Sequence, residues 1–142
     1  MPNPFKIGIA GLGTVGAGVF QLLERNRDLL HTRTGKLLEV AAVSARDRTR
    51  DRGIDASTCR WYDDARELAR DSELDLVVET IGGEDGIARE VCETALQAGK
   101  HLVTANKALI AARGMELAAQ AEAAGRALQF EAAVAGGIPI LK

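Results

Sequence analysis

The feature that most constrains the fold of this chain is a glycine pattern, G-x-G-x-x-G, that spans Gly11 to Gly16. It directly follows the short apolar run at residues 5–10, which is typical of a buried strand. From Thr14 onward, apolar residues recur with the 3.6-residue period of a helix, and we expect this helix to run to about Leu30. A strand, a tight glycine turn and a helix in this order predict the first unit of a parallel α/β domain.

The rest of the chain continues the same alternation. Further strands are predicted at residues 37–43, 60–62, 74–79, 101–104 and 127–132. Helices are predicted from an N-cap at Asp63 to Arg70, over residues 87–96 and over residues 114–124, and polar loops at 32–36 and 44–52. About six strands separated by helices predict one α/β domain with a doubly wound parallel sheet, covered by helices on both faces.

Composition excludes several functional classes. The 142 residues are 46% hydrophobic, which is enough for an apolar core without disulfides or metal. The 18 Lys+Arg nearly balance the 20 Asp+Glu, so no positive field favours nucleic acid or an acidic membrane surface. No apolar run approaches the roughly 18 residues that span a bilayer, and no signal peptide is evident, so we expect a cytoplasmic protein. Cys59 and Cys92 are expected to be reduced packing residues, and His31 and His101 structural ones.

Each glycine of the pattern has a separate chemical reason. Gly11 permits the tight turn, Gly13 lets the backbone approach a pyrophosphate, and Gly16 allows the helix to pack closely on the strand. The unpaired N–H groups at the start of the helix then face the anion. A glycine-rich turn selected only for packing is the alternative, but the flanking strand and helix favour a Rossmann-type dinucleotide-binding domain. The predicted cofactor-contacting residues of this turn are Gly11, Leu12, Gly13, Thr14, Val15 and Gly16.

The end of the second predicted strand indicates which dinucleotide is bound. An acidic residue there would bond the ribose hydroxyls and favour NAD(H). Here the strand ends in Ser44 and Arg46, a small hydroxyl and a planar guanidinium, and this combination suits a 2′-phosphate. We therefore expect NADP(H) to be preferred, with NAD(H) as the alternative. Two other interpretations stay open, namely that Asp47 reaches a ribose, or that the arginines at 46, 48, 50 and 52 form only a solvated loop.

Three segments together resemble the N-terminal nucleotide-binding domain of homoserine dehydrogenases. Residues 7–16 are similar to the family's opening G-x-G-T-V-G pattern, which many dehydrogenases share. Residues 99–107 are similar to its T-x-N-K segment, and residues 131–140 to its E-A-x-V-x-G-G-I-P-I segment. Sugar and polyol oxidoreductases of the same fold often carry Glu-Lys-Pro where this chain has Asn106-Lys107-Ala108, which favours the homoserine enzyme.

The resemblance implies an activity and a set of site residues. The activity is the NAD(P)-dependent interconversion of homoserine and aspartate 4-semialdehyde, a step in threonine, methionine and isoleucine synthesis. By resemblance, Lys107 contacts the cofactor and is catalytic, and Thr104 and Asn106 contact the cofactor. Thr80 follows a strand at the same sheet edge, where its hydroxyl can reach the ribose or nicotinamide. The alternatives are a surface lysine at a helix start and a threonine that only shapes a turn.

The family also has a monovalent cation, usually sodium, bound mainly by backbone carbonyls after the last strand. The matching positions here are Glu131, Val134, Gly136 and Ile138. Hard cations prefer oxygen ligands, and a glycine-containing loop can turn several carbonyls inward. An ordinary loop into the next helix is the alternative.

The resemblance also predicts how the chain is organised. Residues 1–131 form the dinucleotide-binding domain, and residues 132–142 begin the connection to a substrate domain that family members carry and this chain lacks. We therefore expect cofactor binding without turnover, and homo-oligomers only with the missing domain. Two alternatives are another amino-acid or sugar dehydrogenase of the same fold, and a stand-alone NADP(H)-sensing module without catalysis.

Overall fold

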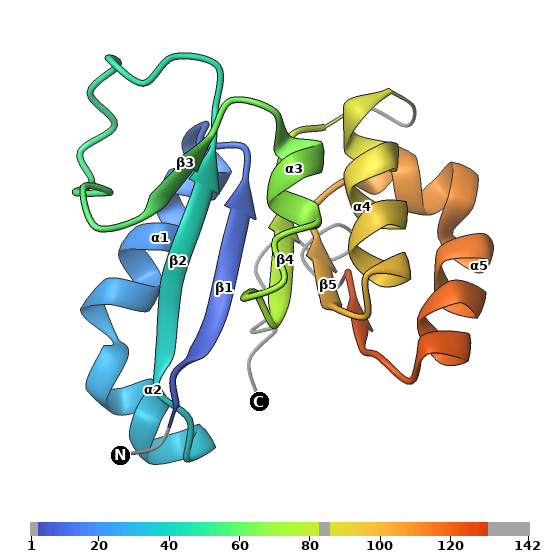
Figure 1. The fold of residues 1–142 in the computed structure, drawn as a ribbon, viewed down its shortest axis with the longest axis horizontal. Coiled ribbons are helices and arrows are strands. Elements are labelled where there is room, and N and C mark those ends of the chain that lie inside the picture. Colours follow the sequence, from blue (N-terminus) through green and yellow to red (C-terminus); the bar gives the residue numbers. More distant parts are fainter. Residues whose placement is uncertain (1–2, 83–85, 131–142) are drawn as a thin grey trace.

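A computed structural model describes residues 3–82 and 86–130, which form one layered α/β domain (Figure 1). The strands are β1 (Phe5–Ala10), β2 (Leu38–Ser44), β3 (Arg60–Tyr62), β4 (Leu76–Glu79), β5 (His101–Thr104) and β6 (Leu128–Gln129). The helices are α1 (Thr14–Arg25), α2 (Arg27–Thr34), α3 (Ala65–Ala69), α4 (Ile87–Gln97) and α5 (Lys107–Ala124). All strand pairs are parallel, in the order β3-β2-β1-β4-β5-β6. The predicted doubly wound parallel sheet is confirmed.

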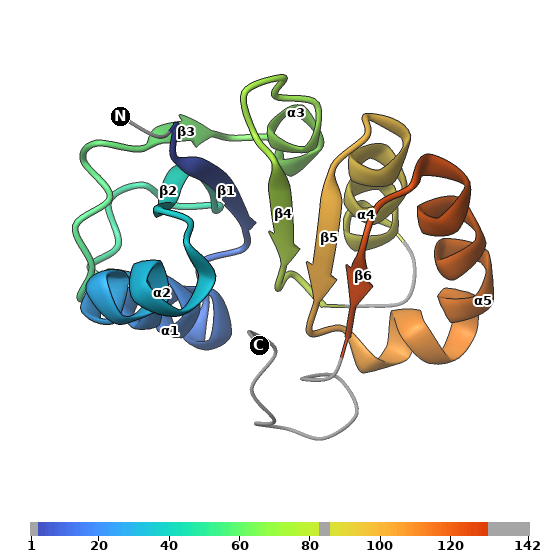
Figure 2. The ribbon, with the colours of Figure 1, turned by 90° about the horizontal axis from the view of Figure 1, so that it is seen from below.

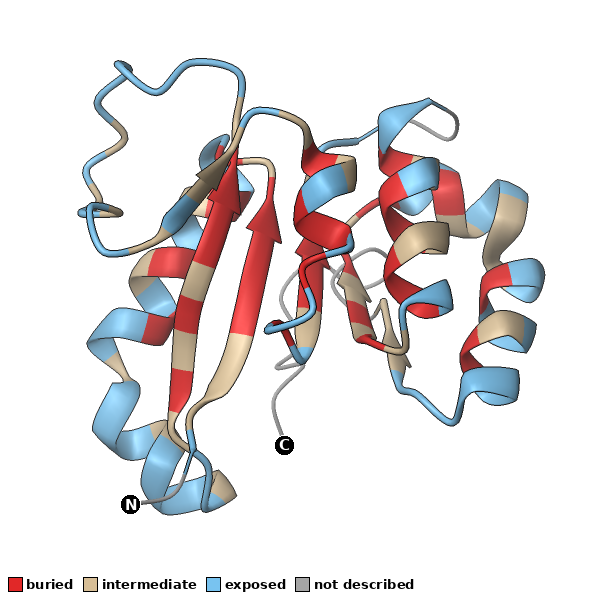
Figure 3. Cartoon of the chain, viewed as in Figure 1, coloured by how far each residue is buried: buried red, intermediate tan, exposed pale blue. Residues whose placement is uncertain are grey.

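Helices cover both faces of the sheet. Figure 2 shows α1 and α2 on one face, and α3, α4 and α5 on the other. On the first face, Phe20 and Leu23 of α1 pack with Ile9 and Val43 of the central strands. On the second face, the small and aliphatic side chains of α3, α4 and α5 pack against the sheet, with Leu68 fully buried among them. Figure 3 shows this burial concentrated in β1, β2 and the inward sides of α3 and α4.

The helix predicted over residues 14–30 is two helices. Asn26 separates α1 from α2, and its side-chain Nδ2 donates to the Leu22 carbonyl at 2.9 Å. The backbone N–H of Asn26 donates to the same carbonyl at 3.1 Å, so both groups close the last turn of α1. The predicted polar loop at 32–36 is also wrong in its first part, because α2 continues to Thr34 and ends at Gly35 with a positive φ of 73°.

Two other helix starts differ from the sequence predictions. The N-cap of α3 is Asp64 rather than Asp63, because the Asp64 Oδ1 accepts from the Arg66 N–H at 2.9 Å. Helix α5 begins at Lys107, seven residues before the predicted start, because Asn106 caps it. In the described part of the chain β6 covers Leu128–Gln129, and the predicted end of this strand at 131–132 lies outside the described residues.

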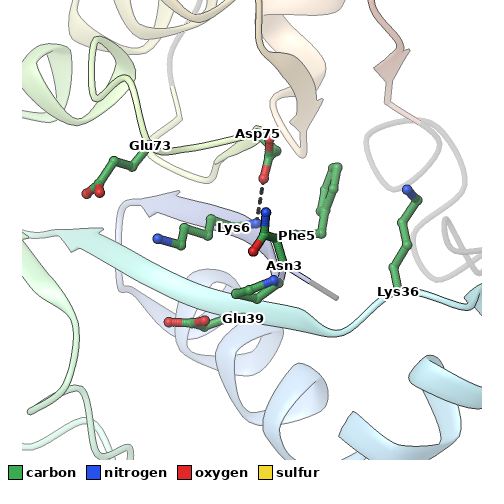
Figure 4. Close-up of a pocket in the computed structure, with 8 residues that line it drawn as sticks. Asn3, Phe5, Lys6, Lys36, Glu39, Glu73 and Asp75 are labelled. Atoms are coloured by element: carbon green, nitrogen blue, oxygen red, sulfur yellow. Dashed lines mark hydrogen bonds between the residues drawn. The ribbon is translucent and has the colours of Figure 1, made fainter. Parts of the chain in front are cut away.

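The amino-terminal edge of the sheet carries an open hollow of about 660 Å³ with charged walls (Figure 4). At its centre the Lys6 N–H donates to the Asp75 carboxylate at 2.8 Å. Nearby, the Phe5 ring stacks on His101, whose Nδ1 accepts from the Ala127 N–H at 2.9 Å. Burial and the charge of Arg126 lower the pKa of His101, which favours the neutral ring that this hydrogen bond requires. The contacts of His101 are therefore structural ones, which join the start of β5 to Phe5 of β1 and to Ala127 just before β6.

Both cysteines are free. Burial raises the pKa of the Cys59 and Cys92 thiols, which suits packing residues rather than reactive ones. No helix in the described part of the chain has the length and apolar character needed to cross a bilayer.

Candidate functional site

The turns that carry the predicted site residues lie at the opposite edge of the sheet, where the parallel strands end. The glycine turn follows β1, Ser44 ends β2, Thr80 follows β4, and Lys107 comes shortly after β5. Because β1 pairs with β2 on one side and with β4 on the other, the chain reverses its winding direction at β1. In open α/β sheets the crevice at such a point is where ligands bind. The fold therefore brings these four segments to the same end of the sheet, where a crevice of this kind is expected.

Two of the three glycines are required by the folded chain itself. Gly11 has φ +100°, and a Cβ there would lie 3.0 Å from the carbonyl carbon and oxygen of Thr80. A Cβ on Gly16 would overlap the Gly11 carbonyl oxygen and lie 2.8 Å from Thr80 Oγ1. The Thr80 hydroxyl in turn donates to the Gly11 carbonyl at 2.6 Å. Gly11, Gly16 and Thr80 therefore form one close-packed contact between the ends of β1 and β4 and the start of α1.

Gly13 differs from the other two, because nothing in the folded chain requires a glycine there. Its φ of −74° suits any residue, it is exposed, and a Cβ would have no neighbour within 4 Å. It is the N-cap of α1, and no side chain caps this helix. The first N–H groups of a helix have no acceptor within the helix, so those of this turn are available to an anion. Thr14 and Val15 are exposed beside it, with 54% of Val15 accessible.

Leu12 has two internal roles. Its side chain is buried in the core on the α1 face. Its carbonyl accepts from Arg52 Nε at 3.0 Å, so the glycine turn is attached to the loop that follows β2. The sequence indicates a basic loop around Arg52 but not this contact, because the two residues are 40 positions apart.

The arginines of that loop differ in the contacts that their side chains make. The guanidinium groups of Arg48 and Arg52 lie over the Trp61 ring, at 5.5 Å and 5.6 Å from its centroid. Arg46 is exposed and forms no hydrogen bond or ion pair with the residues that the structure describes. The Asp47 carboxylate accepts from the N–H and hydroxyl of Thr49, and these bonds lower the pKa of Asp47. Arg46 and Arg50 are therefore the two arginines of this loop whose side chains have no partner among the described residues, and Arg46 is the nearer of them to the end of β2. The Asp47 carboxylate is bonded within its own turn.

Ser44 connects the same loop to the glycine turn. It is buried, and its carbonyl accepts from the Gly11 N–H at 2.8 Å. Its backbone therefore supports the turn, and contact of its side chain with a cofactor stays a prediction.

At the β5 side of the crevice, Thr104 and Asn106 have internal partners. Thr104 is fully buried, and its hydroxyl donates to Glu79 Oε1 at 2.6 Å and accepts from the Asn106 N–H at 3.1 Å. The Asn106 side chain caps α5 by accepting from the Leu109 N–H at 3.0 Å. Lys107, the first residue of α5, is exposed. Direct contact with a cofactor stays a prediction for all three residues.

Glu79 is a residue at this edge that the sequence predictions do not include. Its side chain is fully buried at the end of β4, and its carboxylate accepts from Thr104, from two N–H groups of the following turn and from the Cys92 thiol. The one signal in the sequence was a charged residue that ends an apolar strand.

The four residues matched to a sodium site, Glu131, Val134, Gly136 and Ile138, lie outside the described residues. Within residues 3–82 and 86–130, the structure contains no group of three or more His, Cys, Asp or Glu side chains arranged to hold a metal ion.

Comparison with known proteins agrees with this geometry. Residues 11–131 match the family model described as the NAD binding domain of homoserine dehydrogenase. The chain is 48% identical over 142 residues to the homoserine dehydrogenase of Pseudomonas aeruginosa, covering 99% of this chain and 32% of that protein. It is 42% identical over 140 residues to the homoserine dehydrogenase of Neisseria gonorrhoeae, again covering 99% of this chain and 32% of the relative.

Solved structures give the same result. A homoserine dehydrogenase from Thiobacillus denitrificans aligns with a TM-score of 0.88 and 41% identity, covering 97% of this chain and 32% of that one. The enzyme from S. aureus, at pH 7.5, aligns with a TM-score of 0.85 and 36% identity, covering 94% of this chain and 34% of that one. The chain therefore spans about a third of the length of the relatives that it matches.

Proposed function

The chain belongs to the family of homoserine dehydrogenase NAD-binding domains, and we propose that its glycine turn binds the pyrophosphate of a nicotinamide dinucleotide in the crevice between β1 and β4. In the complete enzyme we propose that this domain serves the interconversion of homoserine and aspartate 4-semialdehyde. The bound cofactor supplies hydride transfer. The residues of this chain bind the cofactor and orient it.

The observation that carries the proposal is the open space at Gly13. Packing accounts for Gly11 and Gly16, but a side chain at position 13 would meet no atom of the protein within 4 Å. At the N-terminus of a helix that follows a strand, a glycine that packing does not require fits a ligand that approaches the backbone at that point. The adjacent helix start supplies N–H groups and the positive end of the helix dipole to an anion. The residues of the turn therefore fit a pyrophosphate.

Gly13→Ser tests the proposal, because serine is a favoured N-cap and the change leaves folding intact. We expect the free energy of unfolding to stay the same or rise, while the Kd for NADPH and NADH rises at least about tenfold, which corresponds to about 1.4 kcal/mol. Titration by nucleotide fluorescence measures the Kd, and urea denaturation measures the stability. Unchanged affinity in a folded Gly13→Ser variant would contradict a pyrophosphate at this turn.

We further propose that Arg46 binds the 2′-phosphate of NADP(H). Two observations support this: Arg46 is exposed without a partner among the described residues, and it lies two positions beyond the end of β2. Arg48 and Arg52 pack on Trp61, so their guanidinium groups already have a role in the loop. Ser44 ends β2 and its carbonyl accepts from the Gly11 N–H, and we propose that its hydroxyl assists the same group.

Arg46→Ala tests the preference for NADP(H). A charge-assisted contact with a phosphate is worth about 1.5–3 kcal/mol, so the Kd for NADPH is expected to rise about tenfold to a hundredfold while that for NADH changes little. Arg50→Ala, in the same exposed loop, is the matched control. An equal loss for both nucleotides, or a loss for neither, rules out the assignment.

For the catalytic side we propose that Lys107 places its ammonium group beside the cofactor and the reacting carbonyl. Its exposure at the first turn of α5, at the same edge as the glycine turn, supports this role. There the charge can stabilise developing negative charge or assist proton transfer. Thr80, Thr104 and Asn106 are proposed to support cofactor binding from the adjoining turns.

The sodium site is also a proposal, carried by the family's pattern at Glu131, Val134, Gly136 and Ile138. So is the division of the chain into a binding domain at 1–131 and a connection at 132–142.

A further inference from the structure

The carboxylate of Glu79 joins the turn that follows β4 to the end of β5. Its Oε2 accepts from the N–H groups of Ile81, at 2.7 Å, and Gly82, at 3.1 Å. Its Oε1 accepts from the Thr104 hydroxyl at 2.6 Å and from the Cys92 thiol at 3.7 Å. The residue is 0% exposed. A charge buried this deeply is costly unless it is satisfied, and here four donors converge on it.

The network continues from Glu79 to every proposed binding segment nearby. Thr80, next to Glu79 in the chain, donates to the Gly11 carbonyl at 2.6 Å and so reaches the glycine turn. On the other side, the Thr104 hydroxyl accepts from the Asn106 N–H, and the Asn106 side chain caps α5, which begins at Lys107. Glu79 therefore lies between Gly11 and the start of α5, linked to the first through its chain neighbour Thr80 and to the second through hydrogen bonds.

The chemistry of the side chain matters as much as its location. A carboxylate accepts at both oxygens and donates nothing, which matches four converging donors. A glutamine has one acceptor oxygen and an NH₂ group. With its oxygen on the two N–H groups of the turn, its NH₂ group would face the Thr104 hydroxyl, which could no longer donate to residue 79 and would have to turn its proton elsewhere. Glutamine preserves the volume of Glu79 and loses this match.

We propose that Glu79 is a positioning residue for the cofactor crevice. It fixes the turn at residues 80–82 relative to the glycine turn and the start of α5, and dinucleotide affinity depends on that placement. The proposal rests on the proposed function, because it requires that this crevice binds the dinucleotide. It predicts a loss of affinity that is separate from any loss of stability, since apparent affinity falls with the fraction of molecules whose turns are correctly placed.

The test uses the 142-residue chain with NADPH as the probe, and measures the Kd and Tm of each variant. We expect Glu79→Gln and Thr104→Val each to raise the Kd for NADPH about tenfold at a temperature where both variants are folded. A tenfold rise corresponds to about one molecule in ten with its turns placed correctly for binding. Thr104→Ser keeps the hydroxyl, and we expect it to recover most of the affinity that Thr104→Val loses.

Lys100→Met is the matched control. Lys100 is also buried, and its Nζ donates to the Leu74 carbonyl at 3.0 Å, but it lies at the amino-terminal edge of the sheet. We expect this variant to lower the Tm and to keep the Kd for NADPH within about threefold, well under the tenfold that 1.4 kcal/mol represents. The comparison separates the loss of a buried polar contact from the loss of crevice geometry.

Three outcomes overturn the inference. If Glu79→Gln and Thr104→Val lower the Tm but bind NADPH as tightly as Lys100→Met, Glu79 serves only the fold. If Glu79→Gln does not fold, the Thr104→Val and Thr104→Ser pair decides the same question, and equal affinities in that pair count against the proposal. If the unmodified chain binds neither NADPH nor NADH, the proposed function itself fails, and the inference fails with it.

Discussion

At the scale of single residues, the glycine turn divides its glycines between two purposes. Gly11 and Gly16 are set by contacts within the protein, since a Cβ on either would approach backbone atoms of the neighbouring turn at 3.0 Å or less. Gly13 has no such contact. The pattern therefore contains two glycines that packing requires and one that we attribute to the ligand. Substitutions at these positions should separate effects on stability from effects on affinity.

Gly16→Ala and Gly18→Ala are a matched pair for the packing requirement, because both change a glycine within α1. The Cβ at 16 would overlap the Gly11 carbonyl and displace backbone, which we expect to cost about 1–3 kcal/mol in the free energy of unfolding. The Cβ at 18 has no neighbour within 4 Å, so Gly18→Ala should stabilise the chain by about 0.4–1 kcal/mol.

Urea denaturation of both variants measures these changes, and NADPH titration should show weaker binding for Gly16→Ala alone. Similar stability in the two variants would mean that the contact between Gly16, Gly11 and Thr80 does not constrain the turn.

At the scale of elements, the strands were the most predictable part of the chain. Each central strand is a short apolar run that ends at a glycine or a polar residue, and buried parallel strands have this pattern because both faces are covered. Both β3 (Arg60–Tyr62) and β5 (His101–Thr104) have the bounds that the sequence predicted. The strand order follows from tertiary contacts, yet the alternation of strands and helices restricts it to a small number of arrangements.

Helix boundaries were less predictable, because single polar side chains decide them. Asn26 ends α1 although apolar residues continue with helical spacing at Leu29 and Leu30, and Leu29 is exposed in α2. In α5 the alanine-rich sequence has little contrast between its faces, so its periodicity does not show where it begins. The start is set by the Asn106 side chain, and an asparagine two residues beyond the predicted end of β5 was a cap signal that the prediction did not use.

The candidate site was predictable where it depends on local pattern and not where it depends on distant partners. The sequence predicted the glycine turn because its strand, glycines and helix are contiguous. The contact between Arg52 and Leu12 spans 40 positions, and that between Thr104 and Glu79 spans 25. No local spacing encodes such pairs, so Glu79 reads in the sequence as an ordinary strand end.

At the scale of the whole molecule, the strand order determines which turns contribute residues to the candidate site. Turns that lie near residues 11, 44, 80 and 106 are distant in sequence, and the parallel sheet brings all of them to one edge. A dinucleotide in the crevice beside them can contact several turns at once. The domain is therefore suited to hold and orient a cofactor through backbone groups and a small number of side chains.

Turnover requires more than the cofactor, because hydride transfer needs the substrate held against the nicotinamide in a reactive geometry. Such positioning contributes about 7–11 kcal/mol to the lowering of a barrier. The chain spans 32% of the length of the Pseudomonas aeruginosa homoserine dehydrogenase, so most of that relative has no counterpart among these 142 residues.

We therefore expect the 142-residue chain to bind NADPH without measurable reduction of aspartate 4-semialdehyde. The loss of substrate positioning alone would slow the reaction by roughly five to eight orders of magnitude, because each 1.36 kcal/mol is a factor of ten. The assay follows NADPH absorbance with saturating nucleotide, and the full-length Pseudomonas aeruginosa enzyme is the positive control. Heat-denatured chain sets the background rate. Turnover within a hundredfold of the control would show that the residues of this domain, Lys107 among them, suffice to position the substrate. That result would contradict the proposal that this domain mainly binds and orients the cofactor in the complete enzyme.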